Sequence, residues 1–172
     1  MKVYNNTIVD WGEDAAITIA HHPHLTALFF IRVNLSDGEL PQGLLSPNFP
    51  VTINDIEFCV VNLRSLPSDL GTKRPQNTML YLENNASVSI PEVMLHMNPM
   101  HLSFDGNPIQ EIPNNLFEVD SIVYVYVGNT LTSVFPANVT SFFSPLAFVY
   151  LYNTQVAYFP TWVDELIARW SE

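Results

Sequence analysis

The sequence predicts an α/β chain built on a curved parallel β-sheet, with low helix content and a capping helix at the C-terminal end. Three observations predict this fold. A pair made of an apolar residue and proline recurs at a nearly constant interval, two alternating apolar residues precede each pair, and apolar residues at helical spacing close the chain. Strands at one fixed period are typical of a solenoid, in which each coil contacts only its neighbours.

The composition restricts the class of protein. The chain has 172 residues, of which 48% are hydrophobic and 13% are charged, and this composition predicts a folded chain with a substantial core. We find no linker that divides it and expect a single domain over residues 1–172. The net charge of −11 leaves no basic surface for nucleic acid. The longest apolar runs are shorter than the ~20 residues that span a bilayer, so we expect no direct membrane insertion.

Residues 1–50 are expected to form irregular coils. Val3, Asn6 and Ile8 resemble the tail of one coil. The next coil has an extra residue, and we assign Phe29 and Ile31 to its interior, Phe30 and Arg32 to its exterior, Asn34 to a buried position and Leu40-Pro41 to its return.

Histidines gather at His21-His22-Pro23-His24, and histidine-rich tracts can bind zinc. Proline constrains this segment, and no carboxylate or cysteine stands nearby at a suitable spacing. We therefore expect a loop here, with no metal and no other cofactor.

Residues 51–160 are expected to form the regular coils. Their prolines, at positions 67, 91, 113, 136 and 160, are separated by 24, 22, 23 and 24 residues. Alternating apolar residues precede each one, and alternation over a short run indicates a strand. The pairs assigned to the interior are Ile56/Phe58, Leu80/Leu82, Leu102/Phe104, Val125/Val127 and Val149/Leu151.

The last two coils allow two registers. Alignment on Asn129 and Asn153 buries four aromatic residues, whereas alignment on the prolines buries the valines and leucine at 125, 127, 149 and 151. We choose the prolines because they keep a six-residue offset in every coil and because buried tyrosine hydroxyls each need a partner. The residues at that offset are Val61, Asn85, Asn107, Thr130 and Thr154.

The segment Leu102–Leu116 reads L-x-F-x-x-N-x-I-x-x-I-P-x-x-L, which resembles the core of a leucine-rich repeat. In this pattern an inward asparagine satisfies backbone groups where the chain leaves the strand. The whole chain fits about six or seven such coils. Residues 161–172 are the predicted cap, in which Thr161 and Asp164 start a helix and Trp162, Leu166 and Trp170 cover the last coil.

Several segments also look like the leucine-rich-repeat region of a group of large oomycete membrane proteins. This resemblance implies a repeat module related to a longer protein with membrane-spanning parts, such as a membrane protein ectodomain, and it implies no catalytic residues. The segments that carry it are Tyr4–Gly12, Ala20–Pro23, Glu39–Leu44, Asp55–Cys59, Asn62–Leu70 and Phe159–Asp164.

The outward strand positions are rich in aromatic and acidic residues, and repeat proteins bind partners on such concave sheets. We therefore predict recognition of a protein or peptide through the strand face, as part of a larger receptor-like or scaffold protein. The alternative is a structural spacer with no ligand. The predicted ligand-binding residues are Tyr81, Glu83, Tyr124, Tyr126, Phe148, Tyr150 and Tyr152.

We predict no enzymatic activity. Cys59 and His101 fall on strands two coils apart, roughly 9–10 Å at ~4.8 Å per strand, which is beyond hydrogen-bond reach. Four N-glycosylation motifs begin at Asn5, Asn34, Asn85 and Asn138. The chosen register buries Asn85 and Asn34, which leaves Asn138 and Asn5 as acceptors.

Overall fold

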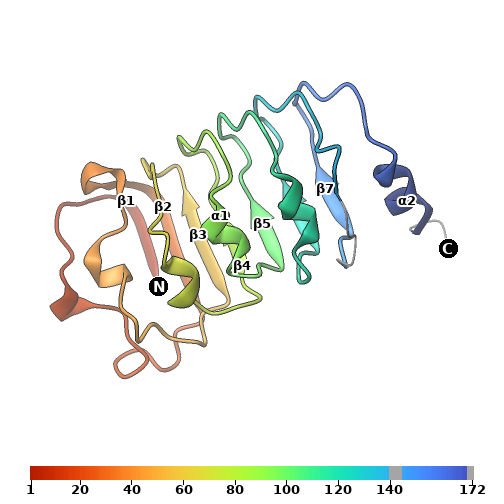
Figure 1. The fold of residues 1–172 in the computed structure, drawn as a ribbon. Coiled ribbons are helices and arrows are strands. Elements are labelled where there is room, and N and C mark those ends of the chain that lie inside the picture. The colour runs from red at the N-terminus through yellow and green to blue at the C-terminus, as the bar shows by residue number, and fades with distance from the viewer. Residues whose placement is uncertain (140–144, 170–172) are drawn as a thin grey trace.

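The computed structural model describes residues 1–139 and 145–169. Its framework is one seven-stranded parallel sheet in which each strand pairs with the next strand along the chain (Figure 1). This confirms the prediction of an α/β chain with a parallel sheet and low helix content. The strands are β1 (Lys2–Ile8), β2 (Ala27–Leu35), β3 (Asp55–Cys59), β4 (Met79–Tyr81), β5 (His101–Ser103), β6 (Tyr124–Tyr126) and β7 (Phe148–Tyr150).

The helical segments are short. The α-helices are α1 (Glu92–Leu95) and α2 (Trp162–Arg169), and 3-10 helices cover Glu13–Ala15, Ser36–Gly38, Gln42–Leu44, Leu70–Thr72 and Asn114–Glu118. Figure 1 shows α1 on one face of the sheet and α2 beyond β7. Among the described helices, none is long and apolar enough to cross a membrane.

The core lies between the sheet and the segments that return from one strand to the next. Leu80, Leu102 and Val125 stand side by side in the strand register and are almost fully buried. The inward pairs of β3 to β6 are buried as the alternation predicts, whereas Val149 and Leu151 at the last strand are only half-buried. Each large apolar side chain buried in this way contributes roughly 1.5–3 kcal/mol.

Asparagines tie neighbouring strand ends together through their side-chain amides. The Asn107 Nδ2 group donates to the carbonyls of Leu82 (2.6 Å) and Phe104 (2.9 Å), and its Oδ1 accepts from the Ser87 N–H. Asn85 bonds the Val61 N–H and the Phe58 carbonyl in the same way. These bonds satisfy backbone groups that turn away from the sheet and would otherwise be unpaired.

In the five regular coils, the residue directly before the position that stands six residues ahead of the proline adopts a left-handed conformation. These residues are Val60 (φ 57°), Asn84 (φ 52°), Gly106 (φ 70°), Asn129 (φ 50°) and Asn153 (φ 53°). Glycine and asparagine tolerate this region, which explains why Asn129 and Asn153 recur without being buried. The β-branched Val60 is strained there.

Strand β2 corrects the assignment for the second coil. Phe30 is fully buried and Phe29 and Ile31 are half-buried, so the predicted interior and exterior are reversed; Arg32 is exposed as predicted. Residues 27–31 are all apolar, so the sequence does not indicate which of them face the core. The left-handed turn at Arg32 (φ 54°) then shifts the pattern.

That shift also corrects the prediction for Asn34, which is exposed and not buried. The Asn34 side chain is therefore accessible for glycosylation, and the side chains of Asn5 and Asn138 are exposed as well. Asn62, which the sequence reading did not assign, bonds the N–H (2.7 Å) and the carbonyl (2.9 Å) of Leu35, while Val61 before it is buried.

Helix α2 closes the end of the core. Trp162 is buried against Phe117 and Phe135, with ring centroids 5.0 and 5.3 Å apart, and its Nε1 donates to the Pro136 carbonyl at 2.8 Å. Leu166, one turn later, is also buried. The third residue predicted for this cap, Trp170, lies outside the described residues.

Candidate functional site: the outer face of the strands

The outward side chains of β3 to β7 form three rows that cross the strands. We call this surface the strand face. The first row is Asp55, Met79, His101, Tyr124 and Phe148; the middle row is Glu57, Tyr81, Ser103, Tyr126 and Tyr150; the third row is Cys59, Glu83, Asp105, Gly128 and Tyr152. Five of the seven predicted binding residues lie in the first two rows, and the other two, Glu83 and Tyr152, lie in the third.

Four aromatic residues on β6 and β7 form an array of nearly parallel rings, which we call the aromatic cluster. Tyr126 and Tyr150 stack with centroids 4.4 Å apart and planes 3° apart. Tyr124 and Phe148 stack at 5.3 Å and 10°. These spacings follow from the distance between neighbouring strands. Phe148 is 47% exposed and Tyr150 is 38% exposed, so the cluster presents a rigid, partly apolar surface to solvent.

The aromatic surface continues onto β5 and β4. The His101 ring lies 4.3 Å from that of Tyr124, and its Nδ1 is 3.3 Å from the Tyr81 hydroxyl. Burial lowers the pKa of His101, which favours the neutral imidazole, and burial raises the pKa of Tyr81 to about 12. Ser103, between Tyr81 and Tyr126, has no exposed surface, so the large neighbouring rings cover it.

An acidic cluster lies beside the aromatic rings and consists of Asp55, Glu57 and Glu83. Glu83 Oε1 accepts a hydrogen bond from Ser103 at 2.6 Å. Burial raises the pKa of Asp55, and burial together with the charges of Asp55 and Glu83 raises the pKa of Glu57. Asp55 Oδ1 is buried and has no hydrogen-bond partner among the described residues.

The third row is held by internal hydrogen bonds that sequence reasoning missed. The Tyr152 hydroxyl donates to Asp105, whose other oxygen accepts from Asn129 Nδ2 at 2.9 Å. A Cβ at Gly128 would lie 2.5 Å from the Tyr152 ring, so the absent side chain leaves the space that the ring occupies. The recurring glycine and asparagines near strand ends are the only sequence signal for this network.

Neither a cysteine nucleophile nor a metal site is assembled from the described residues. Strand β4 separates Cys59 on β3 from His101 on β5. Burial raises the pKa of the Cys59 thiol to about 11, so the reactive thiolate is scarce at neutral pH. His21 and His24 lie in turns and His22 in the irregular segment between them, and no group of three potential ligands gathers within residues 1–139 and 145–169.

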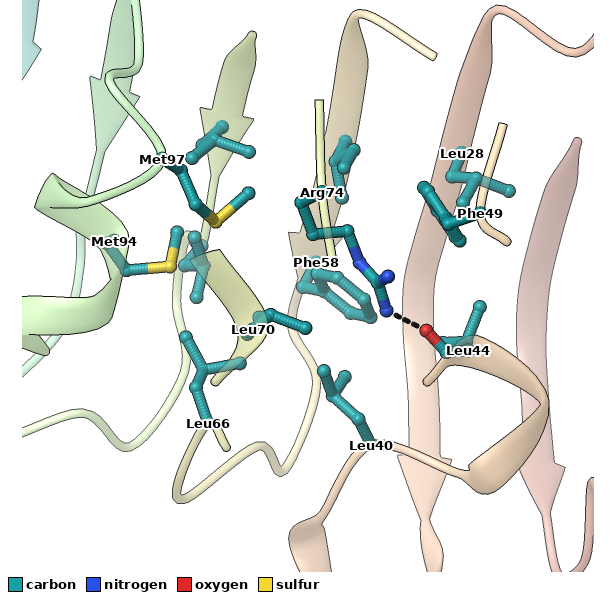
Figure 2. Close-up of a pocket in the computed structure, with 13 residues that line it drawn as sticks. Leu28, Leu40, Leu44, Phe49, Phe58, Leu66, Leu70, Arg74, Met94 and Met97 are labelled. Carbon is teal, nitrogen blue, oxygen red and sulfur yellow. Dashed lines mark hydrogen bonds between the residues drawn. The ribbon is translucent and has the colours of Figure 1, made fainter. Parts of the chain in front are cut away.

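The interior contains an apolar cavity between β2–β4 and the return segments (Figure 2). Leucines, phenylalanines and methionines line it, and the Arg74 guanidinium lies 3.9 Å from the Phe49 ring centre and donates to the Leu44 carbonyl. The space open to water is about 30 Å³, enough for roughly one or two water molecules. This cavity is a gap in the core and too small for a substrate.

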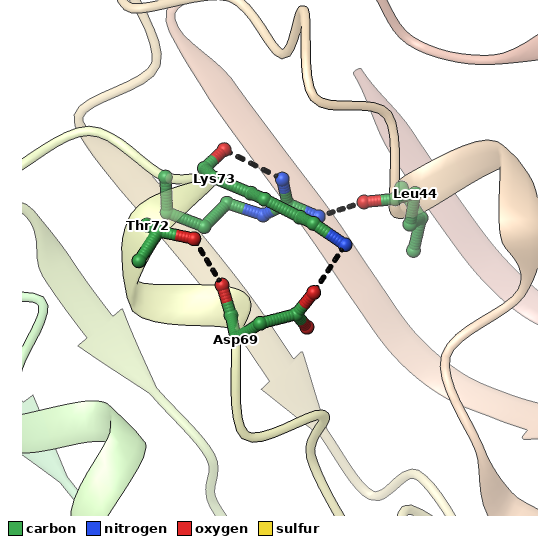
Figure 3. A network of polar contacts seen from close by, with 5 residues as sticks. Leu44, Asp69, Thr72 and Lys73 are labelled. Carbon is green, nitrogen blue, oxygen red and sulfur yellow. Dashed lines mark hydrogen bonds and ion pairs between the residues drawn. The ribbon is translucent and has the colours of Figure 1, made fainter.

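Polar contacts fix the turn that carries Arg74 (Figure 3). Lys73 Nζ lies 2.6 Å from Asp69 Oδ2, and the Thr72 hydroxyl donates to the Asp69 carbonyl at 2.8 Å. Arg74 donates to the Lys73 carbonyl at 2.8 Å. Burial lowers the pKa of Arg74 to about 10, so the group stays protonated at neutral pH and these contacts serve the core.

The sequence matches no protein-family model and no curated protein. The geometry of the chain therefore carries the functional argument. Tyr124, Tyr126, Phe148 and Tyr150 come together in one cluster. Tyr81 lies on β4, two strands from β6, and Glu83 lies shortly after the end of β4. The Tyr152 hydroxyl is directed toward Asp105.

Proposed function

We propose that the chain is a leucine-rich-repeat solenoid, similar to the repeat region of large oomycete membrane proteins, and that it recognises a protein or peptide through its strand face. Support for the fold comes from strands in sequence order joined by segments of similar length and from asparagines that bond the preceding strand end. Such stacks use their open sheet for binding.

The observation that carries the proposed function is the aromatic cluster. Rings stacked by the strand spacing lose little conformational freedom when a partner binds, because their neighbours already hold them. Phe148 and Tyr150 nevertheless keep 47% and 38% of their surface exposed. Aromatic side chains of this kind dominate the energetics of protein interfaces.

A selection with a random-peptide library displayed on phage tests the function. Peptides selected on the wild-type chain are expected to lose at least about tenfold in affinity for Tyr126→Ala/Tyr150→Ala. Tyr158→Ala is the control, because Tyr158 is 74% exposed and lies outside the strands. Circular dichroism verifies that each variant is folded. Unchanged affinity in a folded double variant contradicts the proposed function.

A structural spacer is the second candidate, and the third row favours it. Polar side chains in and beside this row hydrogen-bond one another across three neighbouring strand ends: Tyr152 and Asn129 donate to Asp105, and Asn153 donates to Asn129. These contacts stiffen the sheet whether or not a ligand binds. A spacer predicts that selection yields no peptide whose affinity depends on the aromatic cluster.

A further inference from the structure

The strand face carries negative charge, and the five strands that form it contain no lysine or arginine to balance that charge. Asp55, Glu57, Glu83 and Asp105 all point outward from β3 to β5 or directly after these strands. Strands β3 to β7 contain no lysine or arginine, and the chain as a whole carries a net charge of −11. A partner that covers this face must therefore compensate several carboxylates.

One carboxylate and three aromatic rings lie in the same row across the strands. The middle row runs from Glu57 on β3 through Tyr81 and Tyr126 to Tyr150 on β7. Its four strand gaps span roughly 19 Å, which corresponds to about six residues of an extended peptide. One short segment can thus contact both the acidic cluster and the aromatic cluster.

The first two strands already show a cation on an aromatic ring. Lys2 Nζ lies 5.7 Å from the centre of the Tyr4 ring, and Arg32 Nη1 is 3.4 Å from the Tyr4 hydroxyl. Lys2 is also in register with Phe29 and, through it, with Glu57 at the start of the middle row. The outer surface of this sheet therefore accommodates cations against aromatic and acidic side chains.

We propose that the strand face binds an arginine-bearing extended segment of a partner protein, with guanidinium groups on the outer ring face of Tyr150 and against Glu57 and Glu83. Arginine fits better than lysine because its planar guanidinium stacks on rings and bonds carboxylates in pairs. Only one face of Tyr150 stacks on Tyr126, and the other is directed away from β6. This inference rests on the proposed function, for which it names the partner's chemistry.

The test is a fluorescence titration with labelled nonaarginine at physiological ionic strength. Glu57→Gln/Glu83→Gln is expected to weaken binding about tenfold, because two half-buried carboxylates lose their charge. Glu13→Gln/Asp14→Asn is the matched control, since it removes the same charge from the exposed 3-10 helix Glu13–Ala15, and we expect less than a twofold change. Nonalysine should bind wild-type protein more weakly than nonaarginine.

A second pair of variants tests the ring contact. Tyr150→Leu is expected to weaken nonaarginine binding about threefold, and Tyr158→Leu should leave it unchanged. The inference is overturned if nonaarginine does not bind saturably, if both charge variants weaken it equally, or if nonalysine binds as well. If peptides selected from the library depend on the aromatic cluster while nonaarginine fails, this inference alone is wrong and the proposed function stands.

Discussion

Replacement of Asn107 by alanine tests the role of the buried side-chain amide. Asn107 is 1% exposed, and its amide bonds the N–H of Ser87 and the carbonyls of Leu82 and Phe104. Alanine removes the side-chain partner of all three groups, but the Phe104 carbonyl still accepts from the backbone N–H of residue 107. The Ser87 N–H and the Leu82 carbonyl remain, and each such group left unpaired costs about 1–3 kcal/mol, less where water reaches the half-buried Ser87. We expect the free energy of unfolding to fall by about 2–4 kcal/mol.

Urea denaturation followed by tryptophan fluorescence measures this loss. Asn48→Ala is the control, because Asn48 is exposed and should change stability by less than about 0.5 kcal/mol. If Asn107→Ala lowers the free energy of unfolding no more than the control does, the hydrogen bonds of the Asn107 amide do not stabilise the fold, and the structural argument is refuted.

Three further variants test strain, packing and charge. Val60→Asn should raise stability by about 1 kcal/mol in urea denaturation, since asparagine tolerates the left-handed conformation; a loss contradicts this. Gly128→Ala and Tyr152→Phe should each cost about 0.5–1 kcal/mol, and combining them should add little because both break the contact to Asp105. Full additivity argues against the network. Asp55→Asn should remove a pH dependence of stability, because burial raises the pKa of Asp55 in the folded chain. As the pH falls through that pKa, the wild type should gain stability relative to the variant. Parallel plots of unfolding free energy against pH for the two proteins contradict this.

The regular strands could be predicted because two independent signals agree there. Alternation sets the buried residues of β3 to β6, and the proline interval decides the register between Val125 and Tyr124. Strand β2 offered no alternation, since residues 27–31 are apolar throughout, and its Leu40-Pro41 pair belongs to a coil with an extra residue and so does not fix the register. The left-handed backbone conformation of Arg32 shifts which residues of this strand face the core. An arginine in the sequence does not indicate such a conformation.

The site was predictable as a set of outward positions but not as a set of contacts. The stacking of Tyr126 on Tyr150 follows from neighbouring strands and needs only the register. The orientation of Tyr152 depends on the absent side chain of Gly128 and on Asp105 two strands away. The acidic cluster joins residues of β3 to one that follows β4, and its crowding becomes visible only in three dimensions.

The central claim is that partners bind on the strand face. The most direct measurement is the change in backbone amide NMR signals when a library-selected peptide is added to the uniformly labelled chain. The proposed function predicts that the largest changes fall on β4 to β7 and follow the middle row, which contains Tyr81, Tyr126 and Tyr150. Changes confined to the return segments around α1 and Leu70–Thr72, on the opposite face of the sheet, would contradict it.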